Sequence, residues 1–390
     1  MGKEVNFNQV ISREGTYSEK YDARVDKFGV EDVLPLWVAD MDLPTSPQIV
    51  EALQERISHP MYGYTRYHEG YFSAICRWMK DEHDWDIKTA WITPISSIVT
   101  ALNLSLEVFS KKGDEVLIQP PIYPPFYGAV KKSKRKLLEN ELLLKDGRYE
   151  IDFVDFEAKA KEAKIFLFCS PHNPTGRVWE RWELEKIAQI CKQNSVIIIS
   201  DEVHADLVYD GFSHIPIASL EDAKDITITL NAPSKTFNVA GIVTAYAIIQ
   251  NSSLRRRFFE IFARYSLSEP SLISQTVTIA AYTQSDAWLL ALKNYLSNNL
   301  LYLQEMFMEM PRFQVIQTEA TFLLWIDCRG LQMDDEMLQS WFIKEASLGL
   351  NPGFSFGKGG SGFMRLNFAV PRSMLVQAMK QLKKAYDALS

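Results

Sequence analysis

The chain has 390 residues, more than one hydrophobic core usually holds, so we expect two domains. Its formal net charge of −7 and the lack of a long basic stripe argue against nucleic acid as the main partner. No apolar run reaches the roughly 18 residues that a membrane span needs, and the four cysteines show no paired spacing. We therefore expect a cytoplasmic protein with reduced thiols and no membrane association.

The first 45 residues contain prolines that limit helix formation, and we expect an irregular, extended arm there. Its apolar segment 37–41, which includes Ala39, is either simply buried or forms a wall that faces a substrate. Ser46 and Pro47 then predict the start of an amphipathic helix, as a cap and a first-turn proline. The tyrosine-rich loop 62–67 follows, and its rings serve either packing or a ligand.

Residues 92–99 lead into a helix that we expect over residues 100–109. The unpaired N–H groups and partial positive charge at a helix N-terminus suit a phosphate group. Ser97, Ile98 and Val99 are the candidates for this contact. The alternative is that Ser97 acts only as an ordinary N-cap.

The expected strand 114–118 is followed by a segment stiffened by prolines that carries Tyr123. An aromatic ring held rigidly after a strand can stack on a flat ligand. A buried loop tyrosine with no ligand is the alternative.

Residues 165–250 alternate between apolar strands and helices, which predicts a mostly parallel sheet covered on both faces. The expected strands are 165–169, 196–200, 226–230 and 244–249. A polar segment follows each of the first three, and these segments carry Asn173, Asp201 and Lys235. Since parallel strands end at one edge, we expect the three side chains to meet there.

A carboxylate, an amide and a lysine at one sheet edge suit pyridoxal 5'-phosphate. Asp201 would bind the ring nitrogen, Asn173 the phenolic oxygen, and Lys235 would form a Schiff base. Taken singly, Asp201 also fits a helix cap and Asn173 a common turn. Lys235 is the more informative residue, because lysine rarely lies among apolar neighbours such as Phe237.

The last hundred residues are expected to hold a long helix, 287–310, and then strands and helices in alternation. Arg365 lies within the apolar strand 363–368, where an arginine needs an anionic partner. That partner is either a substrate carboxylate, held by two parallel hydrogen bonds, or a buried acidic side chain of the protein.

Several motifs in this order resemble the fold-type I pyridoxal-phosphate enzymes, and among them the cystathionine β-lyase (C–S lyase) family of the MalY/PatB type. The resemblance covers nearly the whole chain, and the motifs that carry it are 37–42, 170–176, 200–204, 232–238 and 363–367. It implies an α/β, aminotransferase-like fold: a large domain with a mostly parallel central sheet, and a smaller α+β domain. The implied boundaries are 1–45 for the arm, 46–286 for the large domain and 287–390 for the small domain.

The resemblance also implies a homodimer that shares its active site between subunits and acts on a small amino-acid substrate, with no metal. The reaction would be α,β-elimination of L-cystathionine or cysteine S-conjugates to a thiol, pyruvate and ammonia. Lys235 and Tyr123 would be catalytic, with Tyr123 stacked on the pyridine ring and Ser234 on the phosphate. Tyr64 would reach the phosphate of the neighbouring subunit. The residues expected to contact substrate are Arg365, Ala39 and Tyr64.

Two positions depart from the aminotransferase pattern. His204 stands where aminotransferases usually have tyrosine, and we expect it near the cofactor ring. Val243 stands where they usually have an arginine on the phosphate, which leaves the charge partner of the phosphate unknown. Both departures favour the lyase branch. An aminotransferase on the same fold is the alternative, and a regulatory binding protein that keeps the cofactor site is a second.

Overall fold

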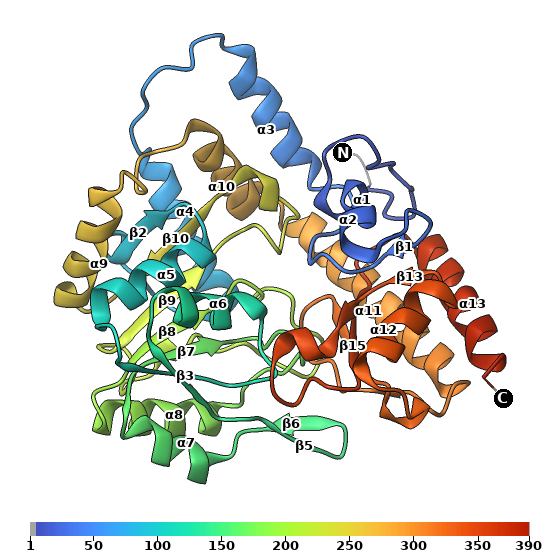
Figure 1. Ribbon diagram of the computed structural model, residues 1–390. Helices are drawn as coiled ribbons and strands as arrows, with labels where there is room; N and C mark the ends of the chain where they lie inside the picture. The colour runs from blue at the N-terminus through green and yellow to red at the C-terminus, as the bar shows by residue number, and fades with distance from the viewer. Residues whose placement is uncertain (1–4, 390) are drawn as a thin grey trace.

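The computed structural model describes residues 5–389, and this part of the chain contains a seven-stranded and a four-stranded sheet (Figure 1). The larger sheet has the spatial order β2 (Ile92–Ile95), β10 (Ala245–Ile248), β9 (Thr227–Asn231), β8 (Ile197–Asp201), β7 (Ala163–Cys169), β3 (Glu115–Ile118) and β4 (Lys136–Glu139). Only β10 is antiparallel to its neighbours, so the other six strands run in one direction. The predicted α/β class with a mostly parallel central sheet is confirmed.

Side chains of the central strands alternate between two apolar layers, as the pleat of a strand requires. Ile165 and Leu167 of β7 pack in one layer with helices α5, α6 and α9, whereas Phe166 and Phe168 pack in the other with α7 and α8. Figure 1 shows these two groups of helices on opposite sides of the sheet. Their bounds are α5 (Ile98–Phe109), α6 (Pro124–Lys132), α7 (Phe153–Ala160), α8 (Arg181–Gln193) and α9 (Ser252–Arg264).

Three further helices pack together at the β2 end of the sheet: α3 (Pro47–Ser58), α4 (Glu69–His83) and α10 (Leu272–Gln284). The hairpin β5 (Leu143–Lys145) and β6 (Arg148–Glu150) lies at the opposite side of the molecule (Figure 1). None of the helices in residues 5–389 is long and apolar enough to cross a membrane.

The C-terminal part is built on the antiparallel sheet β11 (Gln314–Val315), β12 (Leu323–Asp327), β15 (Phe363–Asn367) and β14 (Asn351–Pro352). Its helices are α11 (Asp286–Met308), α12 (Asp335–Lys344) and α13 (Arg372–Asp387). The long helix expected over 287–310 is thus present as α11. The division of the chain at residues 45 and 286 stays a prediction.

The N-terminal arm lies against the C-terminal part, where its strand β1 (Leu34–Pro35) pairs in parallel with β13 (Leu348–Gly349). Residues 1–4 of the predicted arm lie outside the described residues. The expectation of an irregular arm was wrong in one respect, because it contains the short helices α1 (Glu19–Asp22) and α2 (Arg24–Phe28). The prolines of the arm, at position 35 and beyond, all follow these helices, so none of them prevents residues 19–28 from forming helix.

Candidate active site

The predicted acid and amide meet at the carboxyl edge of the large sheet. Cys169 and Asp201 are directly paired in the register of β7 and β8, and the Ser170 N–H donates to the Asp201 carbonyl at 3.0 Å. Asn173 lies three residues beyond Ser170 and is buried. The parallel register therefore brings both segments to one place, as the sequence indicated.

Asp201 is a buried carboxyl group with little to stabilise its charge. Burial raises its pKa to about 7, against the opposing effects of a hydrogen bond from the Val203 N–H at 3.2 Å and of the nearby Lys235 charge. The ionised form of a carboxyl group in such a site is stabilised strongly by pairing with a cationic N–H group. This is the environment expected for a group that holds a proton on a ring nitrogen.

Lys235 lies in the loop after β9, close enough to Asp201 for the charge of each group to shift the pKa of the other. Burial lowers the pKa of its amine to about 8, and the charges of Asp40 and Asp201 oppose this fall while that of Arg365 adds to it. Its Nζ donates to the Ala39 carbonyl oxygen at 2.5 Å. The amine is therefore partly neutral, and hence nucleophilic, near pH 8.

Arg365 lies buried on β15 and is surrounded by neutral acceptors. Its Nη1 donates to Asn173 Oδ1 at 2.9 Å, and its Nη2 donates to the Trp37 carbonyl at 3.0 Å and to Asn351 Oδ1 at 2.8 Å. No carboxylate of residues 5–389 lies within ion-pair distance of the guanidinium, so a buried salt bridge to the protein is not present. Burial lowers its pKa to about 10, which marks a cation without a counter-ion.

Two buried side-chain nitrogen atoms of the site have no hydrogen-bond partner among the described residues. They are Nε of Arg365 itself and Nδ1 of the neighbouring His204. Burial lowers the pKa of His204 to about 3, and the charges of Lys235 and Arg365 lower it further. His204 is therefore a neutral ring near the site. A buried acid, amine and guanidinium with orphaned donors fit a ligand that carries both a pyridine aldehyde and an amino-acid carboxylate.

Tyr123 precedes α6, and its backbone N–H donates to the Asn173 carbonyl at 3.1 Å, which fixes it to the same edge. Burial raises the pKa of its hydroxyl, and the neighbouring Asp201 charge raises it further. The phenol thus stays protonated at neutral pH and can act as a donor.

The phosphate candidates lie at the start of α5. Ser97 caps this helix by accepting the Thr100 N–H at 3.2 Å, which starts the helix at Ile98, two residues earlier than expected. The N–H groups of Ile98 and Val99 thus have no partner within the helix and suit an anion. Ser234, next to Lys235, is only partly buried.

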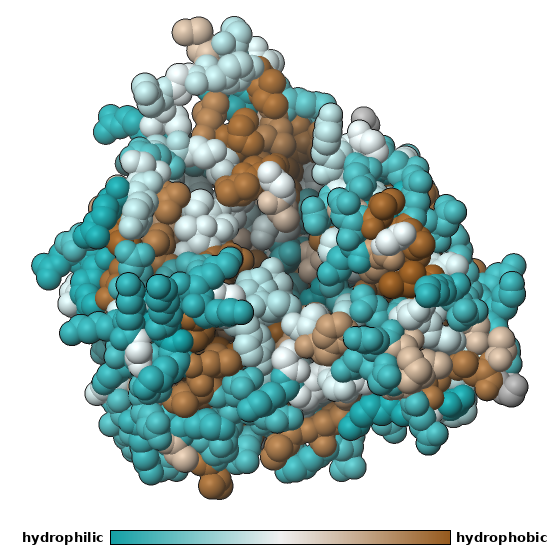
Figure 2. Space-filling model, in the orientation of Figure 1, coloured by the Kyte–Doolittle hydropathy of each residue, from teal (hydrophilic) through white to brown (hydrophobic). Residues whose placement is uncertain are grey.

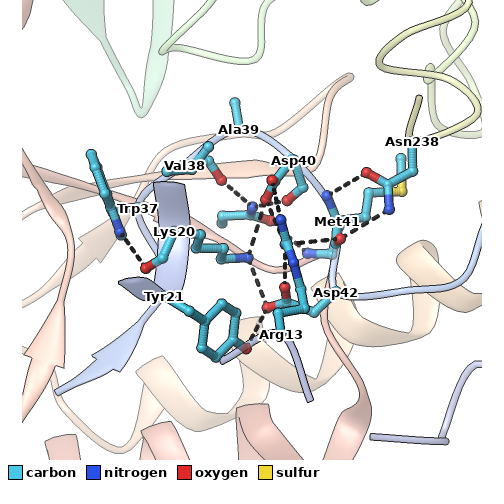
Figure 3. Close-up of polar contacts among 12 residues, drawn as sticks. Arg13, Lys20, Tyr21, Trp37, Val38, Ala39, Asp40, Met41, Asp42 and Asn238 are labelled. Atoms are coloured by element: carbon cyan, nitrogen blue, oxygen red, sulfur yellow. Dashed lines mark hydrogen bonds and ion pairs between the residues drawn. The ribbon is translucent and has the colours of Figure 1, made fainter. Parts of the chain in front are cut away.

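The sequence did not single out the contacts that hold the arm against the lysine loop (Figure 3). Asn238 accepts the Met41 N–H at 3.0 Å and donates to the carbonyl oxygens of Met41 and Leu43. On the other side of the segment, Arg13 makes paired hydrogen bonds to Asp40 of 3.0 and 2.6 Å. Asp40 and Asn238 lie within the motifs 37–42 and 232–238, whereas no sequence pattern indicated Arg13.

Tyr64 does not join the other candidate residues within one chain. It lies on the loop between α3 and α4, and its side chain is fully exposed. Any contact with a cofactor therefore requires a second subunit. Within the described residues, no group of three or more His, Cys, Asp or Glu side chains is arranged to hold a metal ion.

Comparison with known proteins gives consistent matches over nearly the whole chain. Residues 31–382 match the family model "Aminotransferase class I and II". Cystathionine beta-lyase PatB of Bacillus subtilis is 39% identical over 98% of this chain and 100% of its own length, and protein MalY of Escherichia coli is 36% identical over 98% and 99%. Cystalysin from Treponema denticola, solved with a pyridoxal 5'-phosphate cofactor, superimposes with a TM-score of 0.96 at 36% identity over 99% of this chain and 100% of its own. The resemblance inferred from the motifs is confirmed, and the roles of the individual residues stay predictions.

Replacing Asp201 by asparagine tests the electrostatics of the site. Because the buried carboxyl binds a proton up to about pH 7 while the unfolded chain releases it near the ordinary pKa of 3.8, the stability of the wild type falls as the pH rises through this window. Asparagine stays neutral, so the melting temperature of cofactor-free Asp201→Asn should exceed that of the wild type by a margin that grows from pH 5 to pH 8. Scanning calorimetry measures the margin. The exposed Asp210→Asn is the control, and a margin that does not change with pH would contradict the assignment.

Proposed function

The chain belongs to the class I and II aminotransferase family, and on this premise we propose that it is a pyridoxal-phosphate-dependent carbon–sulfur β-lyase. Its substrates are L-cystathionine or related cysteine S-conjugates, and its products are a thiol, pyruvate and ammonia. The observation that carries the proposal is Arg365, a buried guanidinium without a carboxylate partner among residues 5–389, beside a partly buried lysine and a buried acid. An amino acid supplies the missing carboxylate.

The residues that would hold the cofactor lie around Lys235, at the ends of β7 and β8 and at the start of α5. Asp201 would hold a proton at the pyridine nitrogen, Asn173 would bind the phenolic oxygen, and Tyr123 would contact the ring. The N-terminus of α5 and Ser234 would bind the phosphate. Bound in this way, pyridoxal phosphate supplies an electron-withdrawing ring that stabilises negative charge at the substrate α-carbon.

The chemistry of the protein itself is proton transfer and orientation. Arg365 binds the α-carboxylate and thereby orients the Cα–H bond, while the Ala39 segment forms the wall on the other side. Lys235 Nζ takes the α-proton and delivers a proton to the sulfur as the Cβ–S bond breaks, so that a neutral thiol leaves. Tyr123, protonated at neutral pH, assists the same leaving group. Water then converts the remaining three-carbon fragment to pyruvate and ammonia.

The competing activity on this fold is transamination, which uses the same cofactor contacts. His204 and Val243 favour the lyase, because neither residue type matches the aminotransferase pattern at its position. His204 adds a neutral ring where aminotransferases place a phenol that can donate to the cofactor oxygen. An aminotransferase also requires a keto acid as its second substrate, whereas a β-lyase does not.

A homodimer with a shared active site completes the proposal. Apolar residues are exposed along α3 and the loop after it, namely Val50, Ile57, Met61, Tyr62 and Tyr64. Figure 2 shows apolar surface in the region of α3 and α10, and a groove of about 550 Å³ lies between these two helices. A second subunit seated there covers this surface and brings Tyr64 to the phosphate of its partner. We place the enzyme in the cytoplasm, in keeping with its four unpaired cysteines.

The function is tested by incubating the cofactor-loaded protein with L-cystathionine and no keto acid, and by measuring pyruvate with a coupled dehydrogenase. Continuous, stoichiometric release of pyruvate and thiol is expected. Lys235→Ala should lower the rate of pyruvate release by about 10²–10⁴-fold or more, because the substitution removes the general acid–base group. A protein that forms pyruvate only when a keto acid is added is a transaminase, and full turnover by Lys235→Ala would refute the catalytic assignment.

Arg365→Lys tests the carboxylate contact. Lysine keeps the charge but cannot form two parallel hydrogen bonds, so kcat/KM for an S-conjugate of cysteine should fall about 10- to 100-fold. The visible absorbance of the bound cofactor should persist. The matched substrate is the same S-conjugate of cysteamine, which lacks the carboxylate and should react equally slowly with both proteins. An equal loss with both substrates would show that the arginine acts on the fold and not on the carboxylate.

Tyr64→Phe tests the shared site. Losing one hydrogen bond to a charged phosphate should weaken cofactor binding about tenfold without changing the dimer mass measured by light scattering. Tyr62→Phe is the control on the same loop, because the Tyr62 hydroxyl donates to the Ile57 carbonyl of its own chain at 2.5 Å. At a cofactor concentration too low to load Tyr64→Ala dimers, mixing equal amounts of Lys235→Ala and Tyr64→Ala subunits should restore about a quarter of the wild-type activity, because half of the dimers then hold one intact site. No recovery would exclude a site shared in this way.

A further inference from the structure

A buried carboxylate outside the pocket, that of Asp206, connects three separate segments of the large domain. Its Oδ2 accepts the Thr236 hydroxyl at 2.6 Å, and its Oδ1 accepts the Trp78 Nε1–H at 3.0 Å. His83 Nε2 lies 2.9 Å from the same Oδ1. All of these side chains are buried, so water does not replace any of the contacts.

The connected segments are those that carry the two proposed cofactor groups. Thr236 directly follows Lys235, and Asp206 lies in the turn that begins after Asp201 at the end of β8. Trp78 and His83 both belong to α4, so this helix supports the carboxylate from a third segment. Thus one carboxylate ties the turn after β8 to the loop after β9.

Asp206 accepts hydrogen bonds from two donors, the Trp78 indole N–H and the Thr236 hydroxyl. The indole N–H is a donor only. Although burial would raise the pKa of Asp206, hydrogen bonds from His83, Thr236 and Trp78 outweigh it and lower the pKa. The carboxylate is therefore charged, and its bond to the Thr236 hydroxyl is of the stronger, charge-assisted kind.

A second buried chain of contacts leads from His83 back to β8. The rings of His83 and His214 lie 5.4 Å apart in an edge-to-face arrangement, and His214 Nε2 lies 3.0 Å from Glu202 Oε2. The Ser200 hydroxyl donates to Glu202 Oε1 at 2.7 Å. Ser200 and Glu202 are the two neighbours of Asp201, so the backbone on both sides of the acid is held by the same cluster.

From this geometry we infer that Asp206 is a positioning residue, which holds the Lys235 amine at its working distance from Asp201 through the Thr236 hydroxyl. The inference rests on the proposed function, because it concerns the same lysine and acid. It adds a residue that touches neither substrate nor cofactor. Because Thr236 is fully buried and β-branched, its rotamer is restricted, and the hydroxyl bond orients the backbone from which the lysine side chain extends.

The test is Thr236→Val, which keeps the shape of the side chain and removes only the hydroxyl. Loss of positioning should lower kcat about 10- to 100-fold with little change in KM, since small displacements of a reacting group have effects of this size. Thr236→Ser restores the hydroxyl and should restore kcat. Asp206→Asn should lower kcat in the same way. Its kinetics are interpreted only if circular dichroism shows that the variant is folded.

A second measurement does not depend on turnover. The rate at which cofactor-free protein captures pyridoxal phosphate, followed by absorbance and measured over a range of pH, has a midpoint that reports the pKa of the Lys235 amine, because only the neutral amine attacks the aldehyde. In the wild type this pKa is lowered to about 8 by burial. In Thr236→Val the amine is held less firmly away from water, so the midpoint should move upward, toward that of a lysine in solution.

Thr229→Val is the matched control. Thr229 lies on β9, is equally buried, and its hydroxyl has no hydrogen-bond partner among residues 5–389. It should leave both kcat and the midpoint unchanged. Wild-type kcat and midpoint in Thr236→Val, whatever its melting temperature, would overturn the inference. Absence of pyruvate from the wild type would instead refute the proposed function, and the capture midpoint would still test Asp206.

Discussion

The site depends on two opposite charges at one edge of a sheet, a buried carboxyl group and a partly buried amine, which are both largely withdrawn from water. Burial moves the pKa of Asp201 up to about 7 and that of Lys235 down to about 8, so the two values nearly meet. In water the same groups would be fully ionised at neutral pH. The fold thus maintains a carboxyl group that favours a cationic partner and an amine that is partly nucleophilic. A flat molecule with a basic nitrogen at one end and an aldehyde at the other satisfies both.

The groups that hold the two cations of the pocket are neutral acceptors. Arg365 is held by the amide oxygens of Asn173 and Asn351 and by a backbone carbonyl, and Lys235 is held by the carbonyl of Ala39. Neutral acceptors orient a cation without cancelling its charge. The carboxylates that would cancel it are engaged elsewhere: Asp40 is paired with Arg13. The pocket therefore keeps its positive charge for an anionic substrate.

The sequence predicted the positions of site residues best where a polar side chain comes directly after a strand. Parallel strands end at one edge, so Asn173 and Asp201 could be placed together from their spacing alone, and the register of β7 and β8 agrees. Contacts between distant segments left no such signal. Asp206 and Thr236 lie thirty residues apart, and Arg13 lies twenty-seven residues from Asp40, at separations that no periodicity encodes. The start of α5 was expected two residues too late, although Ser97 was already named as a possible N-cap and does cap the helix.

Val243 shows how one departure from a family pattern changes the requirements on the rest of the molecule. It replaces an arginine expected on the phosphate, and it adopts a left-handed conformation with φ of 55°, which is unfavourable for a β-branched residue. The Ser274 hydroxyl donates to its carbonyl at 3.2 Å and helps to hold it there. Since a valine provides no charge, a bound phosphate would depend more on the N-terminus of α5, worth about half a unit charge, and on donors from a second subunit. In the proposed dimer the exposed Tyr64 loop would be such a donor, so cofactor affinity would be coupled to subunit assembly.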